Sequence, residues 1–105
     1  WCPPCVHELP LLSRFQRERE KQGWQVLGLA VDEAAAVAAF MRKTPLSFPV
    51  GMVKADGLAL SRSLGNDQGA LPFTVLFDRQ GRVTQRKIGQ LSSSDLDRWV
   101  QLLPD

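Results

Sequence analysis

The stretch WCPPCVHELP, residues 1–10, contains both cysteines of the chain, and two prolines separate them. Proline is unfavourable inside a helix but harmless in the first turn, where backbone N–H groups have no intrahelical partner. We therefore place Cys2 at the N-cap of a helix, with Pro3 and Pro4 at its first two positions. The stretch predicts a helix that begins directly after one thiol and carries a second, Cys5, about one turn later.

A thiol at the start of a helix lies at the positive end of the helix dipole, where the thiolate is favoured. Free cysteine has a pKa of about 8.5, and such sites lower it to roughly 3.5–7.5. Cys2 is therefore the predicted attacking sulfur, and Cys5, inside the helix, is expected to be shielded and to act as the resolving sulfur. Because prolines have no N–H group, the backbone N–H of Cys5 is the nearest expected donor to the Cys2 thiolate.

Composition places the chain among ordinary globular proteins. It has 105 residues, which we assign to a single domain over residues 1–105, with 44% hydrophobic and 23% charged residues. A net charge of +2 is too small to indicate nucleic-acid binding. Since the chain begins at Trp1, within a motif, we interpret it as the remainder of a longer protein from which a targeting or anchoring segment can be missing.

Hydrophobic periodicity and turn residues predict the secondary structure. The expected helices are residues 3–22, 33–43, 56–64 and 92–103, and the expected strands are residues 24–31, 48–52, 73–77 and 82–88. The first strand is nearly all apolar, so we expect it to be buried on both faces, as in a parallel sheet. Asp32 is the expected N-cap of the second helix, and residues 92–95 offer a capping box for the last one. This order fits a three-layer α/β domain with a strand missing in front.

The spacing Cys-x-x-Cys at the start of a helix in an α/β pattern indicates dithiol–disulfide exchange. The competing hypothesis from another class is a module that delivers copper or zinc through Cys2, Cys5 and His7. A structural zinc site needs four ligands, and His7 points to a different side of the helix from Cys5. We therefore predict no metal site and no organic cofactor, because the Cys2–Cys5 pair itself carries the electrons.

Two segments together resemble a known family. WCPPC followed by Glu8-Leu9-Pro10, and GALPFTVLFDRQG at residues 69–81, are similar to the thioredoxin-like disulfide reductases of the TlpA/ResA type. Residues 48–50 and the helix before them resemble the insertion that distinguishes this branch from plain thioredoxins. The resemblance implies a thioredoxin-like three-layer α/β sandwich with this insertion. Family members have a central strand directly before the Trp-Cys motif, so we expect this domain to be N-terminally incomplete.

The resemblance also implies roles for further residues. Pro72 would follow a cis peptide bond and face the cysteine pair, so that the backbone of Leu71 pairs with an extended substrate segment. Glu8 would be a partly buried acid that tunes the pKa values of the thiols, and the alternative is a solvated helix carboxylate. Trp1 would cover the cysteine pair and shape the docking surface, to which residues 3–4 would contribute.

The predicted function is that of a thiol-disulfide oxidoreductase that reduces protein disulfides. An oxidant that installs disulfides is the alternative, because the reduction potential decides the direction. A peroxidase is a weaker option. We expect a monomer. The resemblance implies a periplasmic or extracytoplasmic setting, with a membrane thiol transporter of the DsbD or CcdA kind as electron donor. Its clients would include apocytochromes c, as in cytochrome c biogenesis, or copper-site assembly proteins.

Overall fold

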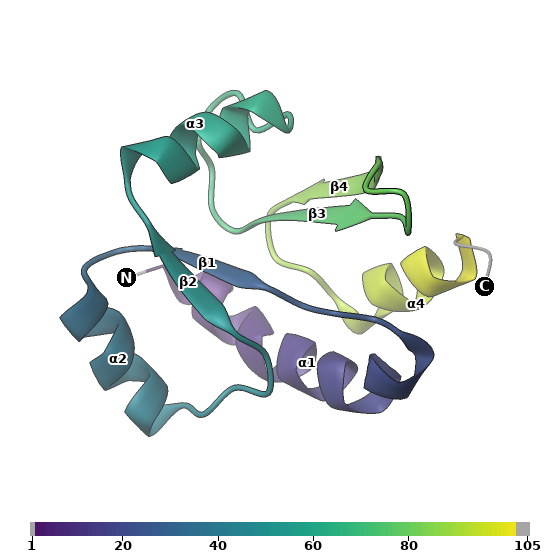
Figure 1. Ribbon diagram of the computed structural model, residues 1–105, viewed down its shortest axis with the longest axis horizontal. Helices are drawn as coiled ribbons and strands as arrows, with labels where there is room; N and C mark the ends of the chain where they lie inside the picture. The colour runs from purple at the N-terminus through teal and green to yellow at the C-terminus, as the bar shows by residue number, and fades with distance from the viewer. Residues whose placement is uncertain (1, 103–105) are drawn as a thin grey trace. The chain divides into compact units, whose positions relative to one another are not determined.

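The computed structural model describes residues 2–102 (Figure 1). In chain order the elements are α1 (Pro3–Arg19), η1 (Glu20–Gln22), β1 (Gly28–Val31), α2 (Ala34–Lys43), β2 (Val50–Val53), α3 (Ala55–Ser63), β3 (Phe73–Phe77), β4 (Val83–Ile88) and α4 (Ser93–Leu102). This order of helices and strands confirms the order predicted from the sequence. The preceding strand, the inserted segment and the single-domain organisation stay predictions.

The described residues form two compact units, one of residues 2–8 with 61–102 and the other of residues 9–60. In the first unit, β3 and β4 form an antiparallel hairpin in which Phe73 pairs with Ile88. The Asp78 carboxylate closes the turn by accepting the backbone N–H of residues 80 and 82. The predicted hairpin is therefore confirmed, with its second strand beginning one residue later than expected.

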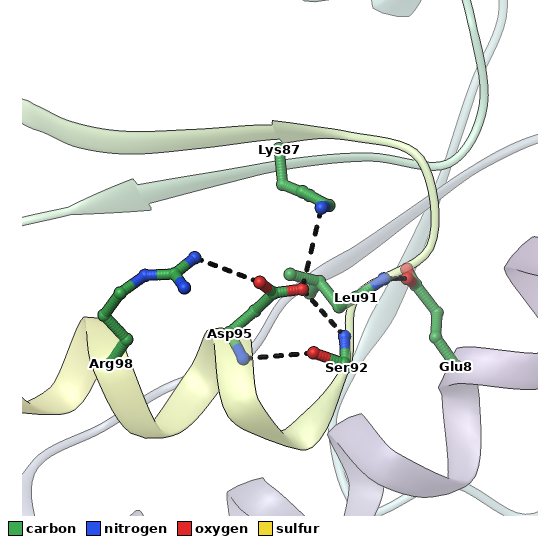
Figure 2. Close-up of polar contacts among 6 residues, drawn as sticks. All are labelled: Glu8, Lys87, Leu91, Ser92, Asp95 and Arg98. Carbon is green, nitrogen blue, oxygen red and sulfur yellow. Dashed lines mark hydrogen bonds and ion pairs between the residues drawn. The ribbon is translucent and has the colours of Figure 1, made fainter.

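Helix α4 begins with the predicted capping box (Figure 2). The Ser92 hydroxyl accepts the backbone N–H of Asp95 at 3.1 Å, and the Asp95 carboxylate accepts the backbone N–H of Ser92 at 3.0 Å. Arg98 and Lys87 approach the same carboxylate at 3.0 and 3.8 Å. The hydrogen bond from the Ser92 backbone, followed by smaller contributions from its hydroxyl and the two cations, lowers the pKa of Asp95.

A Ser92→Ala variant should lower the free energy of unfolding by about 1 kcal/mol, because the backbone N–H of Asp95 loses its cap. Ser93→Ala is the matched control, since Ser93 is the first helical residue and alanine is a better helix former. Chemical denaturation of both variants measures the difference. Equal stabilities would show that the cap contributes nothing.

In the second unit, β1 and β2 pair in parallel, from Gly28 opposite Val50 to Val31 opposite Val53. Strand β1 is shorter than predicted because the side chain of Gln16 hydrogen-bonds to backbone groups of the residues before it. Its amide nitrogen donates to the carbonyl of Trp24 at 3.0 Å, and its amide oxygen accepts the N–H of Val26. These backbone groups are therefore satisfied by a side chain rather than by a neighbouring strand.

The prediction that the first strand is buried on both faces is wrong for the described structure. Leu27, just before β1, and Leu29 and Val31 within it occupy alternate positions and are 65%, 50% and 40% exposed. Gly28, on the opposite face, lies against the buried ring of Phe48. Strand β1 is thus covered on one face only, and the continuous apolar run did not distinguish this from burial on both faces.

Further element boundaries differ from the prediction. Strand β2 covers Val50–Val53 rather than residues 48–52. Helix α2 is preceded by Glu33 as its N-cap, one residue after the expected Asp32. The Asp32 carboxylate instead accepts the backbone N–H of Glu33 at 2.7 Å. Helix α3 begins and ends one residue earlier than predicted, and Gly65 follows it with a φ of 118°.

Helix α1 buries polar residues that hydrophobic periodicity did not identify. Glu8, Ser13 and Gln16 are 6%, 4% and 7% exposed, and each makes a hydrogen bond distant in sequence. Ser13, for example, accepts the backbone N–H of Ser47 at 2.9 Å. Buried polar groups are tolerated when they are paired in this way, so the helix is held by specific bonds as well as by apolar packing.

Candidate active site

Cys2 and Cys5 form a disulfide at the start of α1, with Cα atoms 5.2 Å apart. Cys2 lies immediately before the first helical residue, and its carbonyl accepts the backbone N–H of Val6 at 3.1 Å. Pro3 and Pro4 are the first two helical residues, as predicted, so their missing N–H groups break no helix bond. The local sequence thus places one sulfur at the positive end of α1 and joins it to a second sulfur three residues later.

The backbone N–H of Cys5 donates to the sulfur of Cys2 at 3.3 Å, which confirms the expected donor. Both cysteines are half-buried, so the predicted shielding of Cys5 relative to Cys2 is not seen in this disulfide-bonded state. The two sulfurs differ instead in position. Cys2 precedes the helix and accepts a backbone hydrogen bond, both of which favour a thiolate there once the disulfide is reduced.

His7 is exposed. Within residues 2–102, no three side chains of histidine, cysteine, aspartate or glutamate come together as a metal site. The donor set required for metal delivery, Cys2, Cys5 and His7, is therefore not assembled in this disulfide-bonded structure.

The peptide bond between Leu71 and Pro72 is cis, which confirms the prediction for this bond. Leu71 is 50% exposed, whereas Pro72 is buried. Both residues lie directly before β3, in the same compact unit as the cysteine pair. The Leu71 side chain is therefore accessible beside a fixed bend, and the pairing of its backbone with an extended substrate segment stays a prediction.

The segment 89–91, between β4 and α4, connects this bend to helix α1. The backbone N–H of Gly89 donates to the carbonyl of Pro72 at 2.9 Å. The backbone N–H of Leu91 donates to the carboxylate of Glu8 at 2.8 Å, a contact visible in Figure 2. Gly89 has a φ of 103°, a conformation that favours glycine. Helix α1 and the bend at Pro72 are therefore both hydrogen-bonded to one short segment.

Glu8 is not the solvated carboxylate of the alternative interpretation, since it is 6% exposed. Burial raises its pKa, and the hydrogen bond from Leu91 opposes that shift only in part. A carboxyl group with a raised pKa can hold or release a proton closer to neutral pH than an exposed one. Its predicted effect on the thiols stays a prediction.

Trp1, predicted to cover the cysteine pair, lies outside the described residues. Sequence reasoning also missed three residues that organise the site: Gly89, Leu91 and Asn66. The glycine in IGQ, residues 88–90, was the one available signal for a special backbone conformation after the last strand. Leu91 acts through its backbone, so its residue type gave no signal. Asn66 follows the helix expected at residues 56–64, where the local pattern indicates only a helix end.

Comparison with known proteins assigns this chain to a family. The protein-family model described as Redoxin matches residues 1–100. The chain belongs to the Redoxin family. The similarity of this redoxin to the TlpA/ResA type is supported by relatives named "Thiol-disulfide oxidoreductase ResA". Those of Bacillus cereus (strain ZK / E33L) and Geobacillus kaustophilus (strain HTA426) are both 29% identical to it over 102 residues.

These alignments cover 96% of the redoxin but only 57% and 56% of the two relatives. The chain thus spans little more than half the length of the curated relatives it matches. Among the described residues, no helix has both the length and the apolar character that crossing a bilayer demands.

Solved structures confirm the thioredoxin-like α/β fold. A thioredoxin family protein from Chlorobium tepidum TLS, titled a thiol:disulfide interchange protein, superposes with a TM-score of 0.83 and is 27% identical. That alignment covers 97% of this redoxin and 72% of the other chain. StoA from Bacillus subtilis has a TM-score of 0.75 at 22% identity, with 95% and 75% covered.

Proposed function

We propose that this redoxin is a thiol-disulfide oxidoreductase whose CPPC dithiol reduces disulfides in client proteins. The observation that carries the proposal is the disulfide between Cys2 and Cys5 at the first turn of α1. After reduction, the Cys2 sulfur lies at the start of α1, where a thiolate is stabilised, and the Cys5 sulfur lies close enough to re-form the bond. The matching family and the relatives named as thiol-disulfide oxidoreductases support the same chemistry.

The reaction begins with the reduced protein. The Cys2 thiolate attacks one sulfur of the client disulfide, and the other client sulfur leaves as a thiolate. The Cys5 thiolate then attacks Cys2 in the mixed disulfide, which releases the second client thiolate and forms the Cys2–Cys5 bond. Two electrons have moved from protein to client, so a donor dithiol must reduce the protein before the next cycle. The structure describes the oxidised form that ends this sequence.

We further propose an extracytoplasmic or periplasmic setting, with a membrane thiol transporter of the DsbD or CcdA kind as donor. Apocytochromes c or copper-site assembly proteins are the proposed clients, and the protein acts as a monomer without a metal or organic cofactor. The resemblance to TlpA/ResA-type reductases supports the setting, the donor and the clients, and no cofactor is needed because the two sulfurs carry the electrons.

The direction of electron flow is tested by equilibrating the protein with glutathione redox buffers and measuring the fraction of disulfide by thiol alkylation and mass spectrometry. A reductant should give a potential well below about −200 mV. A potential near about −120 mV would instead support the oxidant. Cys2→Ser is the control, since its lone Cys5 can at most form a mixed disulfide with glutathione, so its mass should show no internal disulfide at any buffer ratio.

A further inference from the structure

Between α3 and β3, the segment 64–70 leads directly to Leu71 and the cis bond at Pro72 (Figure 1). Within it, Asn66 is 1% exposed, which is unusual for an amide side chain. A buried asparagine is costly unless its amide groups are hydrogen-bonded, so its partners show what it holds in place.

The carboxamide of Asn66 bonds to both backbone groups of Ala70. Its nitrogen donates to the carbonyl of Ala70 at 2.7 Å, and its oxygen accepts the backbone N–H of Ala70 at 3.1 Å. The remaining N–H donates to the hydroxyl of Ser61 at 2.9 Å. The side chain therefore takes the place of a neighbouring strand for one residue, and that residue precedes Leu71.

The start of the same segment is fixed against β4. The guanidinium of Arg86 donates to the carbonyl of Leu64. Gly65 lets this side chain approach closely, since a Cβ atom there would lie 3.1 Å from Arg86 Cδ and Nε. The segment is thus held at its start by Arg86 and at its end by Asn66.

These contacts shape the surface beside Leu71. A hollow of about 290 Å³ is lined by residues of this segment and by Ile88. Ile88 is 55% exposed and pairs with Phe73, the residue after Pro72. Together with the half-exposed Leu71, it offers apolar contact area next to the hollow.

We propose that Asn66 is a positioning residue for client binding: by fixing Ala70, it holds the Leu71 backbone and the adjacent hollow ready for an extended client segment. This inference rests on the proposed function. The side chain of Asn66 bonds to Ser61 and Ala70 and not to the sulfurs. Replacing it should therefore weaken the binding of a peptide without changing the reactivity of Cys2.

The test compares Asn66→Ala with the matched control Ser61→Ala in the full chain. Ser61→Ala removes one partner of the carboxamide and leaves both bonds to Ala70. Each reduced protein is mixed with increasing concentrations of a disulfide-bridged peptide, and the half-saturating concentration and maximal rate are measured in a single turnover. Reaction with dithiobis(nitrobenzoate), a small disulfide without a peptide backbone, reports sulfur reactivity alone.

For Asn66→Ala we expect the half-saturating concentration to rise about tenfold, because the backbone next to Leu71 is no longer held. The rate with dithiobis(nitrobenzoate) and both values for Ser61→Ala should match the wild type. An unchanged half-saturating concentration would overturn the inference, and so would a parallel loss of reactivity with the small disulfide. A wild-type protein that reacts with neither disulfide would refute the proposed function itself.

Two further measurements apply if Asn66→Ala does not fold. Asn66→Asp preserves the shape of the side chain, but its carboxylate cannot donate to the carbonyl of Ala70, so the same rise is expected. In the unmodified protein, the amide of Ala70 should exchange its hydrogen slowly. Exchange as fast as in an unstructured peptide would show that Asn66 does not hold it.

Discussion

A Cys5→Ser variant should accumulate a mixed disulfide between Cys2 and its client, whereas Cys2→Ser should form none and should exchange disulfides no faster than the uncatalysed reaction. Cys2 precedes the first residue of α1 and accepts the N–H of Cys5, so it is the sulfur favoured as a thiolate. Without Cys5, nothing in the protein resolves the bond that Cys2 forms.

The trapped species is measured by intact-mass spectrometry under non-reducing conditions, after each reduced variant is mixed with a disulfide-bridged peptide. The two variants control for each other, because each retains a single thiol and loses the internal disulfide. Equal trapping by both would show that the assignment of attacking and resolving sulfurs is wrong.

Replacing Glu8 with alanine should lower the free energy of unfolding by about 1–3 kcal/mol, because the N–H of Leu91 would lose its acceptor. Leu91 is 2% exposed, so water does not readily replace the carboxylate. Glu8→Gln is the matched variant, since its amide oxygen can still accept this hydrogen bond. Urea denaturation of the oxidised proteins measures both effects.

The same pair predicts a pH dependence with a defined sign. Burial raises the pKa of Glu8 in the folded protein, so the folded state binds this proton more tightly than the unfolded state. The wild type should therefore lose stability as the pH rises from the ordinary glutamate value of about 4.3 through the raised pKa. Glu8→Gln has no such proton. Its free energy of unfolding, relative to that of the wild type, should therefore increase with pH across this window. Parallel stability profiles for the two proteins would contradict the raised pKa.

Local sequence rules accounted for much of the fold. Pro3 and Pro4 marked the start of α1 because proline fits only the first turn, and the capping box at residues 92–95 marked the start of α4. The turn around Asp78 was equally predictable, since its carboxylate bonds to backbone groups only two and four residues away. In each case, the deciding interaction joins near neighbours in the chain.

The errors in the length of β1 and in the burial of α1 have the opposite cause. Strand β1 begins at Gly28 rather than Trp24 because Gln16 takes the backbone groups of two of the intervening residues. Hydrophobic periodicity gave no signal for the buried polar residues of α1, whose partners lie as far away as Ser47 and Leu91. No local pattern encodes such a partner.

The sequence by itself determined the chemistry, because the spacing of Cys2 and Cys5 and the start of a helix between them are local properties of five residues. Only the tertiary structure decided which groups surround the bend at Pro72. The backbone N–H of Gly89 reaches its carbonyl from the end of β4, and the backbone N–H of Leu91, two residues later, reaches the carboxylate of Glu8 in α1. These positions depend on how distant segments meet, and a hydrogen bond between such segments has no signature in either one alone.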